Sequence, residues 1–121
     1  MRGILITADD EISVVDLPDP TLDAMQKAVG GYIEHVNPRG LPSPFCMVVN
    51  EDGMALELPQ NLAGTLMYSI LYPILGDILV LKDGCNEHGE PDIVGLTAEE
   101  IEGLLNAFSL GMPFLKEAAR E

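Results

Sequence analysis

The sequence has no tryptophan, few aromatic residues and few basic ones. Aromatics make up 5% of the 121 residues, so an apolar core has to consist mainly of Leu, Ile, Val, Met and Ala. Only six Lys and Arg residues stand against twenty Asp and Glu residues, which gives a net charge of −14. A charge of this sign and size argues against direct binding to nucleic acid or to an anionic membrane, because both are negative.

The chain also has little cysteine and no long unbroken apolar run. Cys46 and Cys85 are the two cysteines, and the short N-terminal apolar run does not fit a signal peptide. We therefore expect reduced thiols and a cytoplasmic protein. Residues 62–81 imitate a membrane span, but Pro73 and Gly76 interrupt them. A buried helix, a turn and a strand are the better interpretation of this segment.

The remaining composition indicates one folded domain. Apolar residues make up 47% of the chain, which is enough for a core and argues against intrinsic disorder. We expect a single α+β domain over residues 1–110 and a short helical tail over 111–121. The expected strands are 4–7, 12–17, 32–36, 45–49, 78–81 and 92–96.

Three stretches between these strands carry helix signals. The first helix is expected between a cap at Asp19 or Thr21 and a stop at Gly30, because glycine readily adopts the left-handed conformation of helix ends. Asn61 is the expected cap of a second, apolar helix over 62–71.

The third helix has the clearest local signal. Thr97 and Glu100 have the spacing of a capping box, in which each side chain bonds a free backbone N–H of the first turn. One apolar stripe follows at helical spacing and consists of Ile101, Leu104, Leu105 and Phe108.

The order of these elements predicts the arrangement of the sheet. The runs 4–7 and 12–17 flank a short polar segment and predict a β-hairpin at the start. A strand–helix–strand unit over 12–36 is followed by a second one over 45–81. This repetition predicts a split β-α-β, ferredoxin-like layout, with 4–7 as an extra edge strand and the C-terminal helix added to the helical layer.

One segment resembles a known family. Gln26–Glu34 reads Gln-Lys-Ala-Val-Gly-Gly-Tyr-Ile-Glu and is the most specific part of the resemblance, and the segments Asn61–Thr65 and Gly76–Val80 also carry it. With these segments, residues 4–96 resemble a family of small acidic domains of unknown function from bacteria, their phages and mobile elements. The resemblance implies no catalytic residue. It implies a setting of mobile-element cargo, where genes against host defences are common.

Thirteen of the twenty acidic residues fall into two stretches that contain no Lys or Arg. They are Asp9, Asp10, Glu11, Asp16, Asp19 and Asp23, and then Asp83, Glu87, Glu90, Asp92, Glu99, Glu100 and Glu102. If they align on one rim, they could imitate duplex DNA, which carries a charge about every 1.7 Å along its axis. The ordinary alternative is that these acids fill turns, begin helices and keep the surface solvated.

Two other groups suggest small-molecule or metal chemistry. Polar-tipped residues in the family-like segments could line a pocket, although each also has an ordinary structural role: Tyr32, Glu34, Asn61 and Tyr68. A second group crowds into one polar loop and offers Cys-x-x-His spacing for zinc, but without the second Cys/His pair of a structural site: Asp83, Cys85, Glu87, His88, Glu90 and Asp92. We expect a solvated loop there and no metal or cofactor.

Catalysis has little support in the sequence. Cys46 could approach His35 if their strands pair, but its apolar surroundings are typical of a buried, inert thiol. We find no phosphate loop, dinucleotide fingerprint or serine elbow. The leading hypothesis is a non-catalytic interaction module that binds a basic host protein, as a DNA mimic or anti-defence protein. The alternative is a small-ligand-binding or regulatory domain, and the oligomeric state stays open.

Overall fold

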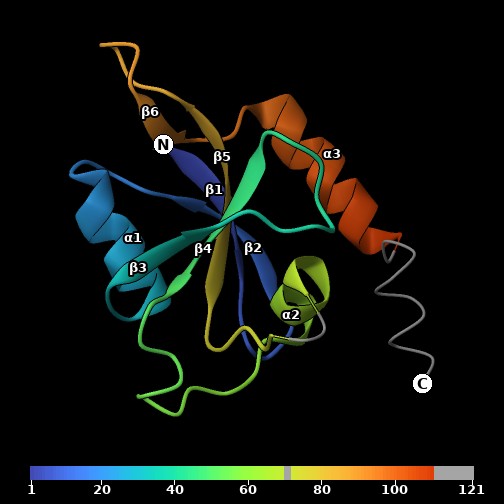
Figure 1. Ribbon diagram of the computed structural model, residues 1–121. Coiled ribbons are helices and arrows are strands. Elements are labelled where there is room, and N and C mark those ends of the chain that lie inside the picture. Colours follow the sequence, from blue (N-terminus) through green and yellow to red (C-terminus); the bar gives the residue numbers. More distant parts are fainter. Residues whose placement is uncertain (70–71, 111–121) are drawn as a thin grey trace.

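The computed structural model describes residues 1–69 and 72–110 (Figure 1). The strands are β1 (Arg2–Ile6), β2 (Ile12–Asp16), β3 (Ile33–Val36), β4 (Phe45–Asn50), β5 (Ile78–Cys85) and β6 (Pro91–Val94). The helices are α1 (Thr21–Val29), α2 (Leu62–Tyr68) and α3 (Ala98–Ser109). The tail expected at 111–121 lies outside the described residues.

The strands form one antiparallel sheet in the order β2-β1-β5-β4-β3. β6 also pairs with β5. It pairs with residues 82–85 of β5, whereas β1 pairs with residues 78–80 on the same strand. We call this end of the sheet, where β5 finishes beside β6, the β6 end. The β1–β2 turn lies at the opposite end, because Ile6 pairs with both Ile12 and Ile78 there.

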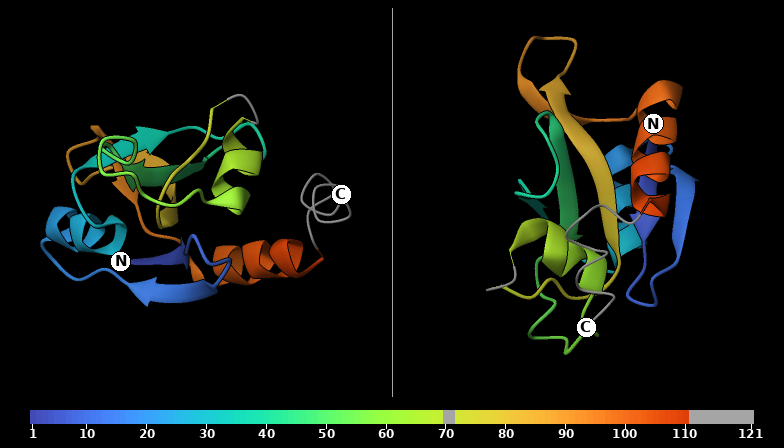
Figure 2. Two further views of the ribbon diagram at one scale, coloured as in Figure 1. Left: turned by 90° about the horizontal axis from the view of Figure 1, so that it is seen from below. Right: turned by 90° about the vertical axis from the view of Figure 1, so that its right-hand side faces the viewer.

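Each face of the sheet carries its own core. Alternate residues of a strand point to opposite faces, so Ile78 and Val80 join one buried cluster while Leu79 and Leu81 join the other. The first cluster packs under α3 and includes Met67 of α2, and the second packs under α1. Figures 1 and 2 show α1 on one side of the strands and α2 and α3 on the other.

The helix boundaries follow from local chemistry, with one correction. α1 ends as expected at Gly30, whose φ of 82° is left-handed and whose N–H bonds the carbonyl of Gln26. Its expected cap at Asp19 or Thr21 is wrong. Pro20 holds the cap position and makes no side-chain capping bond, so the fixed φ of proline and the packing of the helix take the place of a capping side chain.

The caps of the other two helices are confirmed. The Asn61 side chain accepts a hydrogen bond from the backbone N–H of Gly64 at the start of α2. Thr97 and Glu100 form both bonds of the expected capping box at the start of α3. Lys82 of β5 also donates to Glu100 at 2.7 Å, which ties α3 to the sheet.

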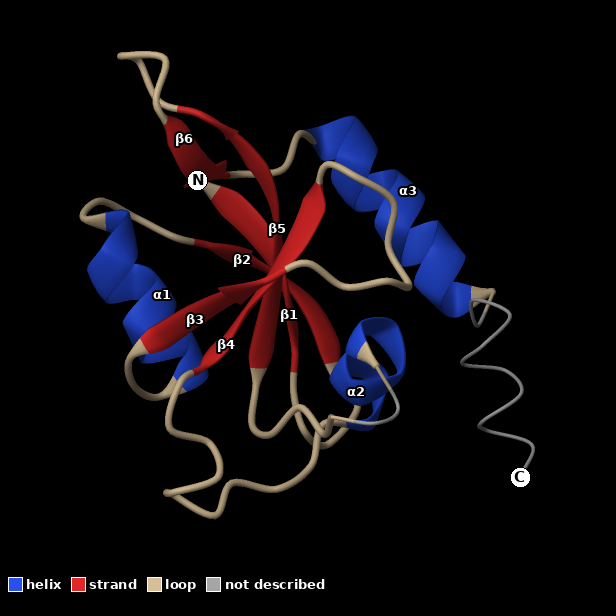
Figure 3. Ribbon diagram, in the orientation of Figure 1, coloured by secondary structure: helices blue, strands red, loops and turns tan. Residues whose placement is uncertain are grey.

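The α+β class, the starting hairpin and the C-terminal helix are confirmed (Figure 3), but the split β-α-β layout is wrong. Neighbouring strands of that layout are also antiparallel, but it would place β2 between β4 and β5, whereas here β4 pairs directly with β5 and β2 pairs with β1. β4 and β5 are apolar on both faces and pair with each other in the interior. β1 is interior and not the expected extra edge strand, whereas β2 forms the edge, where Ile12 and Val14 are 43% and 38% exposed.

Candidate functional site

Three strands bring a polar cluster together at the β6 end, on the face that carries α1. His35 comes from β3, Cys46 from β4 and Asp83 from β5. β4 lies between the other two, with Val48 opposite His35 and Leu81 opposite Cys46. Every second residue of β5 points to the same face of the sheet, so Asp83 lies on the face of Leu79 and Leu81. The sheet therefore places three side chains from distant parts of the chain in one spot.

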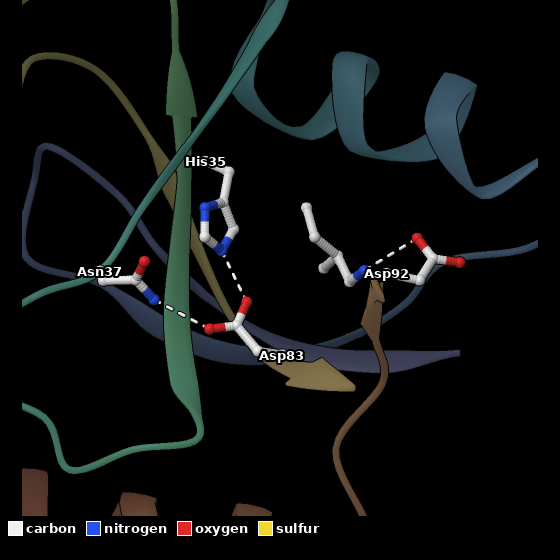
Figure 4. A network of polar contacts seen from close by, with 5 residues as sticks. His35, Asn37, Asp83 and Asp92 are labelled. Atoms are coloured by element: carbon white, nitrogen blue, oxygen red, sulfur yellow. Dashed lines mark hydrogen bonds and ion pairs between the residues drawn. The ribbon is translucent and has the colours of Figure 1, made fainter. Parts of the chain in front are cut away.

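The cluster is held by short hydrogen bonds (Figure 4). His35 Nε2 lies 2.6 Å from Asp83 Oδ1, and Asn37 Nδ2 donates to Asp83 Oδ2 at 2.8 Å. The potential ligand atoms of His35, Cys46 and Asp83 all lie within 4.8 Å of one another. An open pocket of about 410 Å³ adjoins them and is lined by His35, Asp83, Gly84, Pro91, Asp92 and Ile93.

Burial and charge hold the Cys46 thiol in its protonated form. Burial, followed by the negative charge of Asp83 and a hydrogen bond to it, raises the pKa of Cys46 from 9.0 to about 12. A thiol nucleophile needs the opposite shift, because the thiolate is the reactive form. The expected buried position of Cys46 is confirmed, and in this environment its thiol is inert toward nucleophilic catalysis.

The carboxylate of Asp83 responds to its neighbours in the other direction. Its partial burial alone would raise its pKa, but hydrogen bonds from His35 and Asn37 outweigh this effect and hold the pKa below the usual value. Asp83 therefore carries its negative charge at neutral pH. This charge sits at the mouth of the pocket, beside the exposed Asp92.

Asp83 does not lie with the residues that the sequence grouped with it as possible metal ligands. Residues 83–92 are not simply a loop, since β5 continues to Cys85 and β6 begins at Pro91. His88 lies in the turn between them, with Glu87 3.8 Å away. Within the described part of the chain, the cluster that could hold a metal joins Asp83 to His35 and Cys46, and it includes neither Cys85 nor His88. The alternation of Leu79, Leu81 and Asp83 was the available signal.

The four candidate ligand-binding residues do not line one pocket. Asn61 is fully buried, and its amide also donates to the carbonyls of Ile6 and Gly76. Tyr32 is 67% exposed at the start of β3, whereas Tyr68 packs against the core on the face of α2 and α3. Glu34 borders a different, smaller pocket of about 160 Å³. The expected shared pocket does not form, because the side chain of Asn61 is sealed in the core whereas that of Tyr32 projects into solvent.

Most acids of the two stretches, by contrast, lie at the β6 end. β2 ends at the β6 end of the sheet, where Asp16 pairs with Arg2. The chain then continues from β2 into α1. The exposed acids at this end are Asp16, Asp19, Asp23, Asp83, Glu87, Glu90 and Asp92. Asp9, Asp10 and Glu11 occupy the β1–β2 turn at the opposite end, and Glu99, Glu100 and Glu102 belong to α3 on the other face. Figure 1 shows the N-terminus and β6 close together at this end.

Comparison with known proteins adds the family. The family model described as "Domain of unknown function (DUF3846)" matches residues 1–109. The chain belongs to this family. The match confirms the expected membership in a family of unknown function, whereas the importance of Gln26–Glu34 and the mobile-element origin stay predictions. Searches of curated proteins and of solved structures found no match to this DUF3846 domain.

The structure also bears on the segment that imitates a membrane span. Its first part forms α2, which has only seven residues, and its last part belongs to the interior strand β5. None of the helices in residues 1–69 and 72–110 has the length and apolar character needed to cross a bilayer.

Proposed function

We propose that this DUF3846 domain is a non-catalytic interaction module of the cytoplasm that binds a basic surface on another protein through the β6 end. The observation that supports the proposal is that parts of two base-free stretches converge there. Asp16, Asp19 and Asp23 come from the first stretch, and the β5–β6 hairpin contributes the second. Carboxylates on separate elements at one end of a sheet give a local field stronger than the same acids spread evenly.

The nearby bases do little to cancel this field. Lys82 is already paired with Glu100, and Arg2 lies opposite Asp16 on the hairpin. The loop that carries Arg39 reaches toward the other face, since Gly40 bonds the carbonyl of Met67 in α2. The ammonium group of Met1 lies 3.9 Å from Asp16, and His35 and His88 pair with Asp83 and Glu87. Carboxylates still outnumber these basic groups at the β6 end, so electrostatic complementarity would steer a partner with clustered Lys or Arg toward it.

Two charge-matched variants test the proposal. One neutralises five acids at the β6 end: Asp16→Asn, Asp19→Asn, Glu87→Gln, Glu90→Gln and Asp92→Asn. The control neutralises five exposed acids at the opposite end: Asp9→Asn, Asp10→Asn, Glu11→Gln, Glu51→Gln and Asp52→Asn. Both change the net charge of −14 by the same amount, so a difference between them reports location and not total charge.

Binding is measured by quantitative capture from a bacterial lysate and then with the purified partner. We expect the β6-end variant to bind at least about tenfold more weakly than the control, and salt near 1 M to weaken both, because screening there acts within about 3 Å. Equal binding by the two variants, or binding that survives high salt, would refute the proposal. Competition by duplex DNA would identify the partner as a DNA-binding protein and the domain as a DNA mimic or anti-defence protein.

A further inference from the structure

One of the acids at the β6 end, Asp83, also belongs to a polar cluster that combines three types of metal ligand. His35, Cys46 and Asp83 offer an imidazole nitrogen, a thiol sulfur and a carboxylate oxygen from three adjacent strands. This set suits a divalent transition ion of borderline softness, whereas calcium and magnesium prefer oxygen ligands alone. Paired strands of one sheet also hold the three groups in place more precisely than a surface loop would.

The distances fit such an ion after a small movement. With bonds of about 2.0 Å to nitrogen and oxygen and 2.3 Å to sulfur, tetrahedral ligand atoms stand about 3.3–3.6 Å apart. The three atoms here lie within 4.8 Å of one another, and the shortest pair, His35 Nε2 and Asp83 Oδ1, is 2.6 Å apart. These two side chains are 37% and 45% exposed, so they can separate by the required fraction of an ångström. The side chain of Cys46 is buried, so its sulfur keeps its position while the other two ligands adjust.

We propose that His35, Cys46 and Asp83 bind one zinc-class divalent ion, whose fourth position opens into the pocket formed with Pro91 and Ile93. A zinc site with three protein ligands keeps that position for water or a small exchangeable ligand. Asn37 acts as a positioning residue, since it already holds the second oxygen of Asp83 at 2.8 Å. The pocket provides the entry path from solvent.

The charges balance when the ion enters. Cys46 exchanges its proton for the metal and releases that proton to solvent, because a coordinating thiol is deprotonated. His35 binds as neutral imidazole through Nε2, with its proton on Nδ1. Thiolate and carboxylate together cancel the two charges of the ion. The exposed Asp92 at the pocket mouth adds a negative potential that attracts the cation.

Cobalt(II) is the probe, added to the full chain after treatment with a chelator. We expect one ion per chain, the near-ultraviolet charge-transfer band of a thiolate bound to cobalt, intense tetrahedral visible bands, and loss of all these bands when zinc is added. Cys46→Ser should abolish the charge-transfer band, whereas the matched Cys85→Ser should keep it. His35→Gln should weaken binding about tenfold or more, whereas the matched His88→Gln should not change it.

His35 and His88 are exposed, so their variants keep the test informative if Cys46→Ser does not fold. A wild-type protein that shows no thiolate band, a band that Cys85→Ser removes, or equal affinities for His35→Gln and His88→Gln would overturn the proposal. The same titration separates it from the acidic surface, because the variant neutralised at five β6-end positions keeps all three ligands. That variant should still give the thiolate band.

Discussion

The buried side chain of Asn61 gives the sharpest prediction, because it distinguishes a structural residue from a binding residue. Its amide donates to the carbonyls of Ile6 and Gly76, both at 2.9 Å, and its oxygen accepts from Gly64 at 2.9 Å. These contacts join β1, the start of α2 and the segment before β5. Asn61→Asp keeps the shape and the capping oxygen but removes both donated hydrogen bonds.

The magnitude follows from these two lost bonds. Each buried carbonyl left without a donor costs about 1–3 kcal/mol, so we expect Asn61→Asp to lower the free energy of unfolding by about 2–6 kcal/mol. A buried charge adds to the cost, and the new carboxyl escapes part of it by taking up a proton. The protonated acid can also donate one bond. The loss should therefore be smaller at pH 4 than at pH 8.

Urea unfolding followed by circular dichroism measures this effect, since the chain has no tryptophan to report by fluorescence. Thr97→Ala is the matched control, because it removes the capping side chain of an exposed helix start and should cost about 1 kcal/mol. If Asn61→Asp costs no more than Thr97→Ala, or costs the same at both pH values, the structural role argued for Asn61 is wrong.

Three further predictions concern the core and the polar cluster. Met47 is fully buried, and Met47→Ala should lower the free energy of unfolding in urea by about 2–5 kcal/mol. Met54 is 80% exposed, and Met54→Ala should lower it by less than about 0.5 kcal/mol. Similar values for the two variants would contradict the assigned core. The pKa of Cys46 rises from 9.0 to about 12 on folding. The free energy of unfolding of chelator-treated wild type should therefore fall by about 2 kcal/mol between pH 8 and 10.5, relative to Cys46→Ala. Parallel stability curves for the two proteins would refute this. The lowered pKa of Asp83 stabilises the fold at pH values above the pKa of this carboxyl in the unfolded chain, and this stability is lost as the pH falls through its pKa in the folded protein. Asp83→Asn should therefore make the free energy of unfolding less dependent on pH in the acid range. An unchanged dependence would count against the bond between Asp83 and His35.

Local signals predicted the starts of α2 and α3 and the interior strands β4 and β5. The Thr97–Glu100 box and the Asn61 cap depend on residues within one turn, so their chemistry can be read without knowing the fold. β4 and β5 carry apolar residues on both faces, which indicates interior strands whatever their partners. The same signals did not reveal that β5 extends to Cys85, because pairing with β4 and β6 holds its polar end in the sheet.

The candidate site needed the pairing of strands. His35 and Cys46 were expected to approach each other if β3 and β4 formed a hairpin, and they do. Asp83 is distant in sequence and reached the cluster only because β5 adds to the other edge of β4. Tyr32, Glu34, Asn61 and Tyr68 show the reverse case. They share family-like segments, but Asn61 is fully buried, Tyr32 is 67% exposed and Glu34 borders a separate pocket.

By itself, the sequence determined the α+β class, the composition of the core, the hairpin and most helix boundaries, because these depend on apolar periodicity and on contacts within a few residues. Only the tertiary structure decided which strands are neighbours. Strand order depends on how the apolar faces of all strands are buried together, and here that put β1 inside and left β2 at the edge. The same order carried parts of the two acidic stretches to the β6 end and placed His35, Cys46 and Asp83 within reach of one ion.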